Sequence, residues 1–336
     1  MRIGPIDFDL ANAARRIIEG ALGIVTGERV VLIVDAERRD LGATLLEVSR
    51  AVGADTELFE LEICGPRPAR RLPDVLHAAL SRAQASLLLV GFEEGEIPMR
   101  IELTSLVKTL GLRHAHMVGV TRRSMLAGFS VDTSRILDAT RAVRTRMRPD
   151  SVLRLRTPAG SDLEVKLGPA GRWAEHVGVI RPGRWENLPT GEIVTTPLGI
   201  DGVFVADASV GAHFGQAAGL LTDRPLRFEV EGGWMKAVRC VDLSLQRNVE
   251  SFLRSEHNGA RVGVVSLGTN VGIYAPSGDI MCDQNLPGLH LGFGSSFPDQ
   301  TGASWNARSQ LTVTCANADV DLDGVPLLRH GRYMIT

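Results

Sequence analysis

Cysteine, tyrosine and long apolar runs are all scarce in this chain of 336 residues. The four cysteines, Cys64, Cys240, Cys282 and Cys315, lie far apart without a CxxC pair, which excludes a zinc knuckle and a disulfide-rich scaffold. No apolar run approaches the roughly 18 residues of a membrane span, and the first residues lack the pattern of a signal peptide. The sequence therefore predicts a cytoplasmic protein with no membrane partner.

An excess of charge of either sign is also absent. The 37 Lys and Arg residues nearly balance the 39 Asp and Glu residues, which leaves a formal net charge of -2. So small an imbalance gives no broad positive field for nucleic acid. Hydrophobic residues make up 44% of the chain and charged residues 23%, as in ordinary globular proteins. We therefore expect a small-molecule substrate and no nucleic-acid partner.

The first 149 residues alternate between helical periodicity and short aliphatic runs. Such alternation is typical of a doubly wound, mainly parallel sheet. The turn after Val34 has no glycine cluster and no GxxxxGK[ST] motif occurs, so a nucleotide site is disfavoured. The expected helices are 9–22, 42–52, 72–82, 101–110 and 131–146, and the expected strands are 29–34, 56–61, 86–91 and 116–120.

After residue 149 the pattern changes to alternating strands. Residues 153–156 and 163–166 predict a hairpin, residues 203–206 and 226–230 predict further strands, and 243–253 predict one helix. Pro149 breaks the preceding helix at this point. We therefore predict an α/β protein of two domains. Residues 1–149 form a doubly wound, mainly parallel N-terminal domain, and residues 150–336 form a strand-rich α+β C-terminal domain that carries the site.

Two segments of the second half carry candidate catalytic groups. In the segment 187–192, which reads NLPTGE, a Pro/Gly turn precedes Glu192 and an apolar run follows it. Such a turn can hold a carboxylate stiffly at a strand edge, where a metal or a substrate proton reaches it; a solvated charge is the alternative. His290 lies in the glycine-rich segment 288–294. These glycines either let backbone N–H groups approach a substrate oxyanion or permit tight strand turns.

The order of these segments resembles the leucyl aminopeptidase T type of metallo-aminopeptidase, whose family includes 2,5-dihydroxypyridine dioxygenases. The resemblance rests on residues 160–163, 182–197, 278–294 and 323–324. In the peptidases of this family two zinc or cobalt ions activate water and polarise the scissile carbonyl. The resemblance assigns two of the metal-ligand positions to Glu192 and His290. It also implies a homodimer or a higher homo-oligomer that assembles through the second domain.

Other ligand positions of the family carry different residue types in this chain. The family's glutamate falls on Val264, and its HxD pair falls on Thr312 and Thr314 or, in a second register, on Gln310 and Thr312. A tyrosine of the family falls on Phe297. A pair of divalent cations needs several carboxylate or imidazole ligands, and the single iron of the dioxygenases needs two histidines and an aspartate. The metal site is therefore expected to be reduced or absent.

A rebuilt site with one metal ion remains chemically reasonable. It would combine Glu192 and His290 with a third ligand from His257, His213 or Asp283, although each of these three alone is more typical of a surface or core residue. The sequence does not decide whether a metal ion is bound at this site. If one is bound, zinc, cobalt and iron are the candidates. Without a metal, Glu192 and His290 are expected to form an acid–base pair.

Three functional hypotheses follow from these residues. The first is a divergent hydrolase that acts on a small amide or heteroaromatic ring compound through Glu192 and His290. The second is an Fe(II) ring-cleaving dioxygenase. The segment 182–185, PGRW, resembles the corresponding sequence of the dioxygenases more closely than that of the peptidases. The third is a catalytically silent binding protein on the same scaffold. The residues expected to bind a substrate are Arg184, Trp185, Phe297, Thr312 and Thr314.

Overall fold

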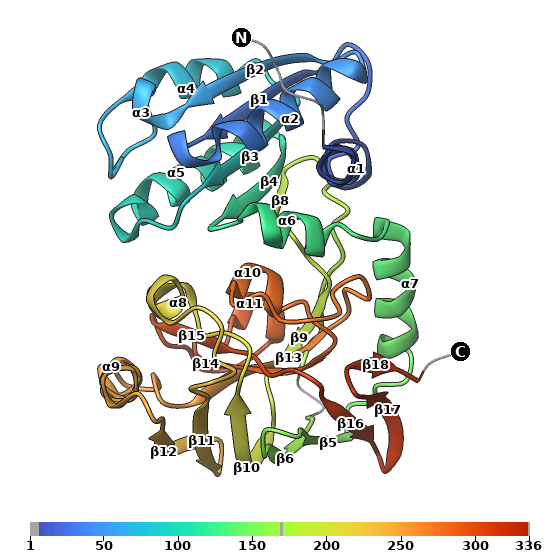
Figure 1. Ribbon diagram of the computed structural model, residues 1–336, viewed down its shortest axis with the longest axis vertical. Helices are drawn as coiled ribbons and strands as arrows, with labels where there is room; N and C mark the ends of the chain where they lie inside the picture. The colour runs from blue at the N-terminus through green and yellow to red at the C-terminus, as the bar shows by residue number, and fades with distance from the viewer. Residues whose placement is uncertain (1–6, 169–170, 335–336) are drawn as a thin grey trace. The chain divides into compact units, whose positions relative to one another are not determined.

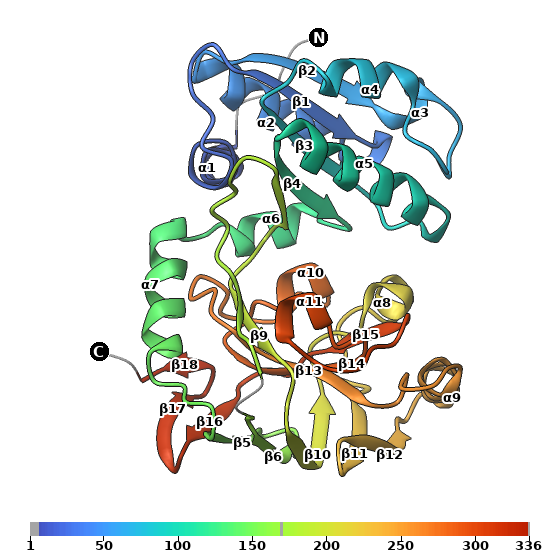
Figure 2. The ribbon, with the colours of Figure 1, turned by 180° about the vertical axis from the view of Figure 1, so that it is seen from behind.

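A computed structural model describes residues 7–168 and 171–334 of the chain (Figures 1 and 2). The chain divides into two compact units: unit 1 consists of Met1–Thr133 and Gly178–Thr190, and unit 2 of Ser134–Val177 and Gly191–Thr336. This division differs from the predicted break after residue 149 in two respects. Helix α7 (Thr133–Arg144) falls almost wholly in unit 2, and Gly178–Thr190 returns to unit 1. The amino-acid composition does not change at the points where the chain passes from one unit to the other, so the sequence pattern does not reveal these points.

Unit 1 is built on a five-stranded sheet in the order β2-β1-β3-β4-β8, in which every pair is parallel. The predicted parallel α/β architecture is thus confirmed. β1 and β3 are buried almost throughout, as expected for strands that helices cover on both faces. The sequence pattern does not predict β8, because its residues RWEN form no aliphatic run. The strands are β1 (Arg29–Val34), β2 (Asp55–Glu60), β3 (Ala85–Val90), β4 (Arg113–Val118) and β8 (Arg184–Asn187).

Helices lie on both sides of this sheet, with α3, α4 and α5 on one side and α1, α2 and α6 on the other (Figure 1). α5 begins four residues earlier than the periodicity indicates, because Pro98 fits the first turn of a helix, where its missing N–H is not needed. A π-helical turn, Arg16–Ala21, continues α1. The helices are α1 (Phe8–Arg15), α2 (Arg39–Ala51), α3 (Leu61–Cys64), α4 (Asp74–Leu80), α5 (Ile97–Leu110) and α6 (Arg122–Gly128).

Unit 2 contains two antiparallel sheets, which confirms the predicted strand-rich half. The larger, sheet B, has the order β12-β11-β10-β6-β5-β16-β17-β18, and the smaller, sheet C, has the order β15-β14-β13-β9-β7. Sheet B comprises β5 (Val152–Arg156), β6 (Asp162–Lys166), β10 (Gly199–Ala206), β11 (Leu226–Glu231), β12 (Trp234–Arg239), β16 (Asp319–Leu322), β17 (Val325–Arg329) and β18 (Arg332–Tyr333). Sheet C comprises β7 (Ala174–His176), β9 (Glu192–Thr195), β13 (Val262–Gly268), β14 (Gly288–Gly294) and β15 (Gln310–Val313).

The two sheets of unit 2 pack face to face around one hydrophobic core. Ile193, Leu267 and Leu291 of sheet C share this core with residues of sheet B. The rings of Phe228 and Phe293 meet across it with centroids 5.1 Å apart. Figures 1 and 2 both show α8, α10 and α11 on the side of sheet C that faces away from sheet B. The helices of unit 2, besides α7, are α8 (Ala212–Ala218), α9 (Leu243–Arg254), α10 (Ile280–Asp283) and α11 (Pro298–Thr301).

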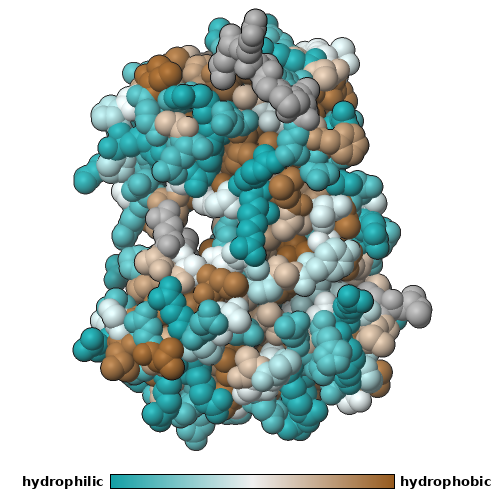
Figure 3. Space-filling model, in the orientation of Figure 1, coloured by the Kyte–Doolittle hydropathy of each residue, from teal (hydrophilic) through white to brown (hydrophobic). Residues whose placement is uncertain are grey.

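The face drawn in Figure 3 is largely hydrophilic, and its hydrophobic residues form small separate patches. Within the described ranges, every helix is too short or too polar to cross a bilayer.

Candidate acid–base site on sheet C

The strand register places the main candidate residues on one face of sheet C. Glu192 on β9 pairs with Gly268 on β13, and two residues away Ser266 pairs with His290 on β14. Directly paired residues of antiparallel strands share a face, and so do residues two apart along a strand. Glu192, Ser266 and His290 therefore lie on the same face, opposite the hydrophobic core. Thr312 joins this face because it pairs with Gly292.

Glu192 and His290 share this face without touching. They lie on the two strands that flank β13, and standard strand spacings put their α-carbons roughly 12 Å apart. Ser266 lies between them, and its hydroxyl donates a hydrogen bond to the carboxylate of Glu192. The carboxyl group and the imidazole are thus separate groups on one face of the sheet, so a direct proton transfer between them needs an intervening molecule.

The turn before Glu192 has a steric reason for its glycine. Gly191 has a φ of 126°, and a Cβ at this position would lie 2.7 Å from the backbone nitrogen of Asn270. The carbonyl of Gly191 accepts a hydrogen bond from the N–H of Thr269 at 2.6 Å. Only glycine accommodates this conformation and this close approach at low cost. The turn therefore holds the start of β9 against the end of β13.

Glu192 has a pKa suited to proton transfer at neutral pH. Burial raises the pKa of its carboxyl from 4.5 to about 7, and the hydrogen bond from Ser266 opposes this shift. Burial disfavours the charged form because the protein solvates a carboxylate less well than water does. A general base or acid is most effective when its pKa lies near the working pH. Glu192 therefore exists as a mixture of carboxylate and carboxylic acid near pH 7.

A second imidazole, which the sequence reasoning missed, lies directly beside Glu192. His176 on β7 pairs with Glu192 across the strands, so the two side chains share a face at adjacent positions. Burial lowers the pKa of His176, and a side-chain hydrogen bond with Gln300 opposes the shift. The ring is therefore neutral at pH 7 and can donate or accept a hydrogen bond. Its segment carries no motif, and only the pairing of β7 with β9 reveals the neighbour.

Both ring nitrogens of His290 form hydrogen bonds with backbone groups. Its Nε2–H donates to the carbonyl of Leu286 at 2.8 Å, and its Nδ1 accepts from the N–H of Cys315 at 3.4 Å. Burial lowers the pKa of His290 to about 4, so the ring is neutral. Both nitrogen atoms are thus occupied, which leaves neither for a metal ion or a substrate. The geometry favours a structural role for this residue over the catalytic role that the resemblance suggests.

Substitution His290→Leu should therefore destabilise unit 2. It would leave the buried N–H of Cys315 and the carbonyl of Leu286 without partners, at a cost of about 2–4 kcal/mol. Urea unfolding followed by the fluorescence of the tryptophans would measure the loss. The control His257→Ala changes an exposed histidine and should leave the transition in place. A His290→Leu protein as stable as the parent would contradict the structural role.

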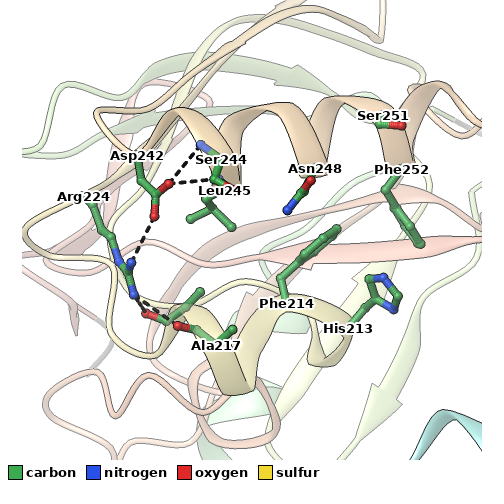
Figure 4. Close-up of a pocket in the computed structure, with 11 residues that line it drawn as sticks. His213, Phe214, Ala217, Arg224, Asp242, Ser244, Leu245, Asn248, Ser251 and Phe252 are labelled. Carbon is green, nitrogen blue, oxygen red and sulfur yellow. Dashed lines mark hydrogen bonds and ion pairs between the residues drawn. The ribbon is translucent and has the colours of Figure 1, made fainter.

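The three proposed third ligands lie in different settings. Asp283 is buried, and its carboxylate accepts hydrogen bonds from the N–H groups of Ser277 and Gly278 at 2.8 and 2.9 Å. His257 is exposed in the turn after α9. His213 lines a pocket of 590 Å³ between α8 and α9, where its ring stacks on Phe252 with centroids 5.2 Å apart (Figure 4). Neither Glu192 nor His290 lines this pocket, so His213 belongs to another part of unit 2.

The donor set of sheet C does not fit the family's metal ions. The resemblance places family ligand positions on Val264 and Thr312, whose side chains are aliphatic and hydroxylic, and Thr312 shares the face of Glu192. Thr314 uses its Oγ1 in a hydrogen bond with Ser209 at 2.8 Å. Throughout the described part of the chain, no three His, Cys, Asp or Glu side chains are arranged to hold a metal ion. Zinc, cobalt and iron sites need such ligands, which hydroxyl and aliphatic groups do not replace.

The remaining predicted substrate-binding residues fall in both units. Arg184 and Trp185 lie on β8 of unit 1, and both are exposed. Phe297, in unit 2, is partly buried and precedes α11 with a φ of 47°, an uncommon conformation for a bulky side chain. The structure thus brings Thr312 to the face of Glu192 and assigns Arg184 and Trp185 to the other unit.

The architecture matches two solved structures along nearly the whole chain. AmpT from Thermus thermophilus superposes with a TM-score of 0.68 at 18% identity, covering 97% of this chain and 99% of that one. A 2,5-dihydroxypyridine dioxygenase from Pseudomonas putida KT2440 superposes with a TM-score of 0.66 at 15% identity, covering 98% of each chain. The chain has the aminopeptidase T fold. At these identities the likeness concerns the fold alone, and this fold accommodates both a peptidase and a dioxygenase.

Neither a family model nor a curated protein matches the chain. The resemblance read from the sequence is therefore confirmed through the aminopeptidase T fold, over both units.

Proposed function

We propose that this protein is a divergent aminopeptidase T-like hydrolase that uses Glu192 as its general base and does not need the family's pair of metal ions. The observation that carries the proposal is a carboxyl group with a pKa near 7, held beside the neutral imidazole of His176. A small amide, including one attached to a heteroaromatic ring, is the substrate class that such a pair can hydrolyse. Peptide specificity is not part of the proposal.

The reaction follows from the protonation states of these groups. The carboxylate of Glu192 takes a proton from a water molecule while the water oxygen bonds to the amide carbon. The resulting carboxylic acid then returns the proton to the leaving nitrogen as the carbon–nitrogen bond breaks, so that Glu192 ends unprotonated. His176 donates a hydrogen bond to the oxygen that gains negative charge, and Ser266 holds the carboxylate in place. Atoms and charge balance without a metal ion.

A catalytically silent binding protein is the second candidate. The replacement of ligands at Val264 and Thr312 and the commitment of His290 to backbone hydrogen bonds favour it. The two candidates differ in whether the carboxyl group of Glu192, with its pKa near 7, transfers a proton to a substrate. Turnover of an amide therefore decides between the two.

The test is a panel of aminoacyl 4-nitroanilides and small aromatic amides, assayed at pH 8 before and after treatment with a metal chelator. The proposal predicts hydrolysis of at least one compound at a rate that chelation does not change. Activity that appears only with added zinc or cobalt would contradict the proposed mechanism. Oxygen consumption with added Fe(II) would instead favour the dioxygenase, and the absence of any turnover would favour the binding protein.

A further inference from the structure

Arg100 on α5 is a partly buried cation whose side chain has no acceptor within the described ranges of the chain. Its Nε atom is shielded from solvent and has no hydrogen-bond partner. Its guanidinium carbon lies 5.2 Å from the centre of the Phe92 ring. The acidic residue that acts on it, Glu96, is held by Arg67 through contacts of 2.7 and 2.8 Å. A buried donor without an acceptor is costly, so this arrangement needs an explanation.

A chain of hydrogen bonds leads to His116, an imidazole that the charge of Arg100 acts on. Ser86 on β3 bonds to Nδ1 of His114 at 2.8 Å, and Nε2 of His114 bonds to Nδ1 of His116 at 3.3 Å. Burial, and secondly the charge of Arg100, lower the pKa of His116 to about 3, so its ring is neutral. When the Ser86 hydroxyl donates, each imidazole passes the donor role along the chain. In this tautomer, and not in the reverse one, His116 presents its Nε2–H as a second donor.

Two aromatic rings border these donors. Phe92 lies against the guanidinium of Arg100, and the ring of Trp185 lies 5.5 Å from that of His116, tilted by 56°. Trp185 is 43% exposed although it is the largest side chain on β8. An exposed tryptophan next to a buried imidazole offers a flat apolar surface to a ligand. The cluster thus combines one positive charge, one neutral donor and two aromatic faces, all from unit 1.

We propose that Arg100 and His116 bind the carboxylate of a small planar aromatic acid whose ring packs against Trp185 and Phe92. A guanidinium and an N–H donor match the two oxygens of a carboxylate, and a single positive charge matches a monoanion. A phosphate dianion would leave about one negative charge uncompensated. This site goes beyond the proposed hydrolase, because none of the residues of sheet C takes part in it.

The test is calorimetric titration of the full-length protein with sodium benzoate. We expect saturable binding to the parent protein, and Arg100→Met should weaken it by about tenfold or more, since a hydrogen-bonded charge pair is lost. Arg100→Lys, which keeps the charge, should bind with intermediate affinity. The matched control Arg82→Met removes an exposed arginine in the turn after α4 and should leave the Kd unchanged. Equal losses in both methionine variants, or no saturable binding, would overturn the proposal.

Two further measurements separate this site from others. Benzyl alcohol and acetate, which each lack one half of the ligand, should bind at least tenfold more weakly than benzoate. Benzoate should quench the fluorescence of the parent protein, and Trp185→Phe should remove that quenching. Glu192→Gln should leave benzoate binding intact; if it abolished binding, the ligand would occupy the site on sheet C and the proposal for Arg100 would fall. Amide turnover plays no part in either result, so the two proposals fail independently.

Discussion

Glu192→Gln is expected to lower kcat/KM for amide hydrolysis by about 10²–10⁴-fold, the usual contribution of a positioned general base. Glutamine fills the same space but cannot accept a proton from water. The loss should appear mainly in kcat, because the carboxylate acts on the water and does not hold the substrate. Initial rates on the best substrate of the amide panel would measure it.

The matched control is Glu175→Gln, the same chemical change one strand away. Glu175 pairs with Ile193, so it lies on the opposite face of sheet C from Glu192. Its carboxylate forms an ion pair with Arg144 at 3.6 Å, and both side chains are more than a third exposed. Surface pairs of this kind contribute little to stability, so the control should keep both fold and activity. Equal activity in the two variants would remove Glu192 from the mechanism.

The parent activity should rise with pH and level off above about pH 7. The carboxylate form of Glu192 is the active base, and the pKa of this group is raised to about 7 by burial. A profile of kcat/KM between pH 5 and 9 reports the pKa of the free enzyme. A midpoint of the profile near pH 4.5 would show that burial does not perturb the pKa of the catalytic carboxyl. A rate that falls as pH rises would show that Glu192 acts as an acid.

Glu192→Gln should also stabilise the protein at alkaline pH. Because the folded-state pKa of Glu192 lies above its ordinary value of 4.5, the folded state binds its proton more tightly than the unfolded state. Stability is therefore fully present below about pH 4.5 and is lost as pH rises to about 7. A shift from 4.5 to about 7 corresponds to roughly 3 kcal/mol, since 1 pKa unit equals about 1.4 kcal/mol. Glutamine removes this penalty.

Urea unfolding of both proteins at pH 4.5 and at pH 8 measures this effect. The variant should exceed the parent in stability by about 3 kcal/mol at pH 8 and by little at pH 4.5. Taking the difference between variant and parent cancels the contribution of every other titrating group. An equal difference at both pH values would mean that residue 192 is not titrating in the folded protein. A variant that gains stability and loses activity would show that the protein keeps a destabilising buried carboxylate at residue 192 for its function.

The architecture, and the turn that precedes Glu192, could be predicted from the sequence. Buried aliphatic strands such as β1 and β3 are visible in sequence because both of their faces are covered, and the Pro/Gly turn before Glu192 is visible because its glycine is sterically required. β8 and β7 are short and polar, so no local pattern reveals them. His176 lies beside Glu192 only through long-range pairing. A local sequence pattern predicts a strand or a turn. The sequence does not predict which residues of distant segments become neighbours through strand pairing.

The role of His290 could not be predicted for a related reason. The resemblance suggests a metal-ligand role for His290, but the hydrogen bonds that occupy both of its nitrogens come from the backbone of Leu286 and Cys315. Backbone groups carry no signature in the sequence. The same holds for Arg100, whose missing acceptor becomes visible only when every neighbour in the fold is known.

The central claim is that the carboxyl of Glu192 titrates near neutral pH. Labelling the glutamate side chains with ¹³C and following their carboxyl resonances by NMR from pH 4 to 9 tests it directly, with Glu192→Gln identifying the signal. We predict one resonance with a midpoint near pH 7 that is missing in the variant. If the resonance that disappears in the variant has its midpoint near pH 4.5, the proposed base is an ordinary carboxylate and the account is wrong.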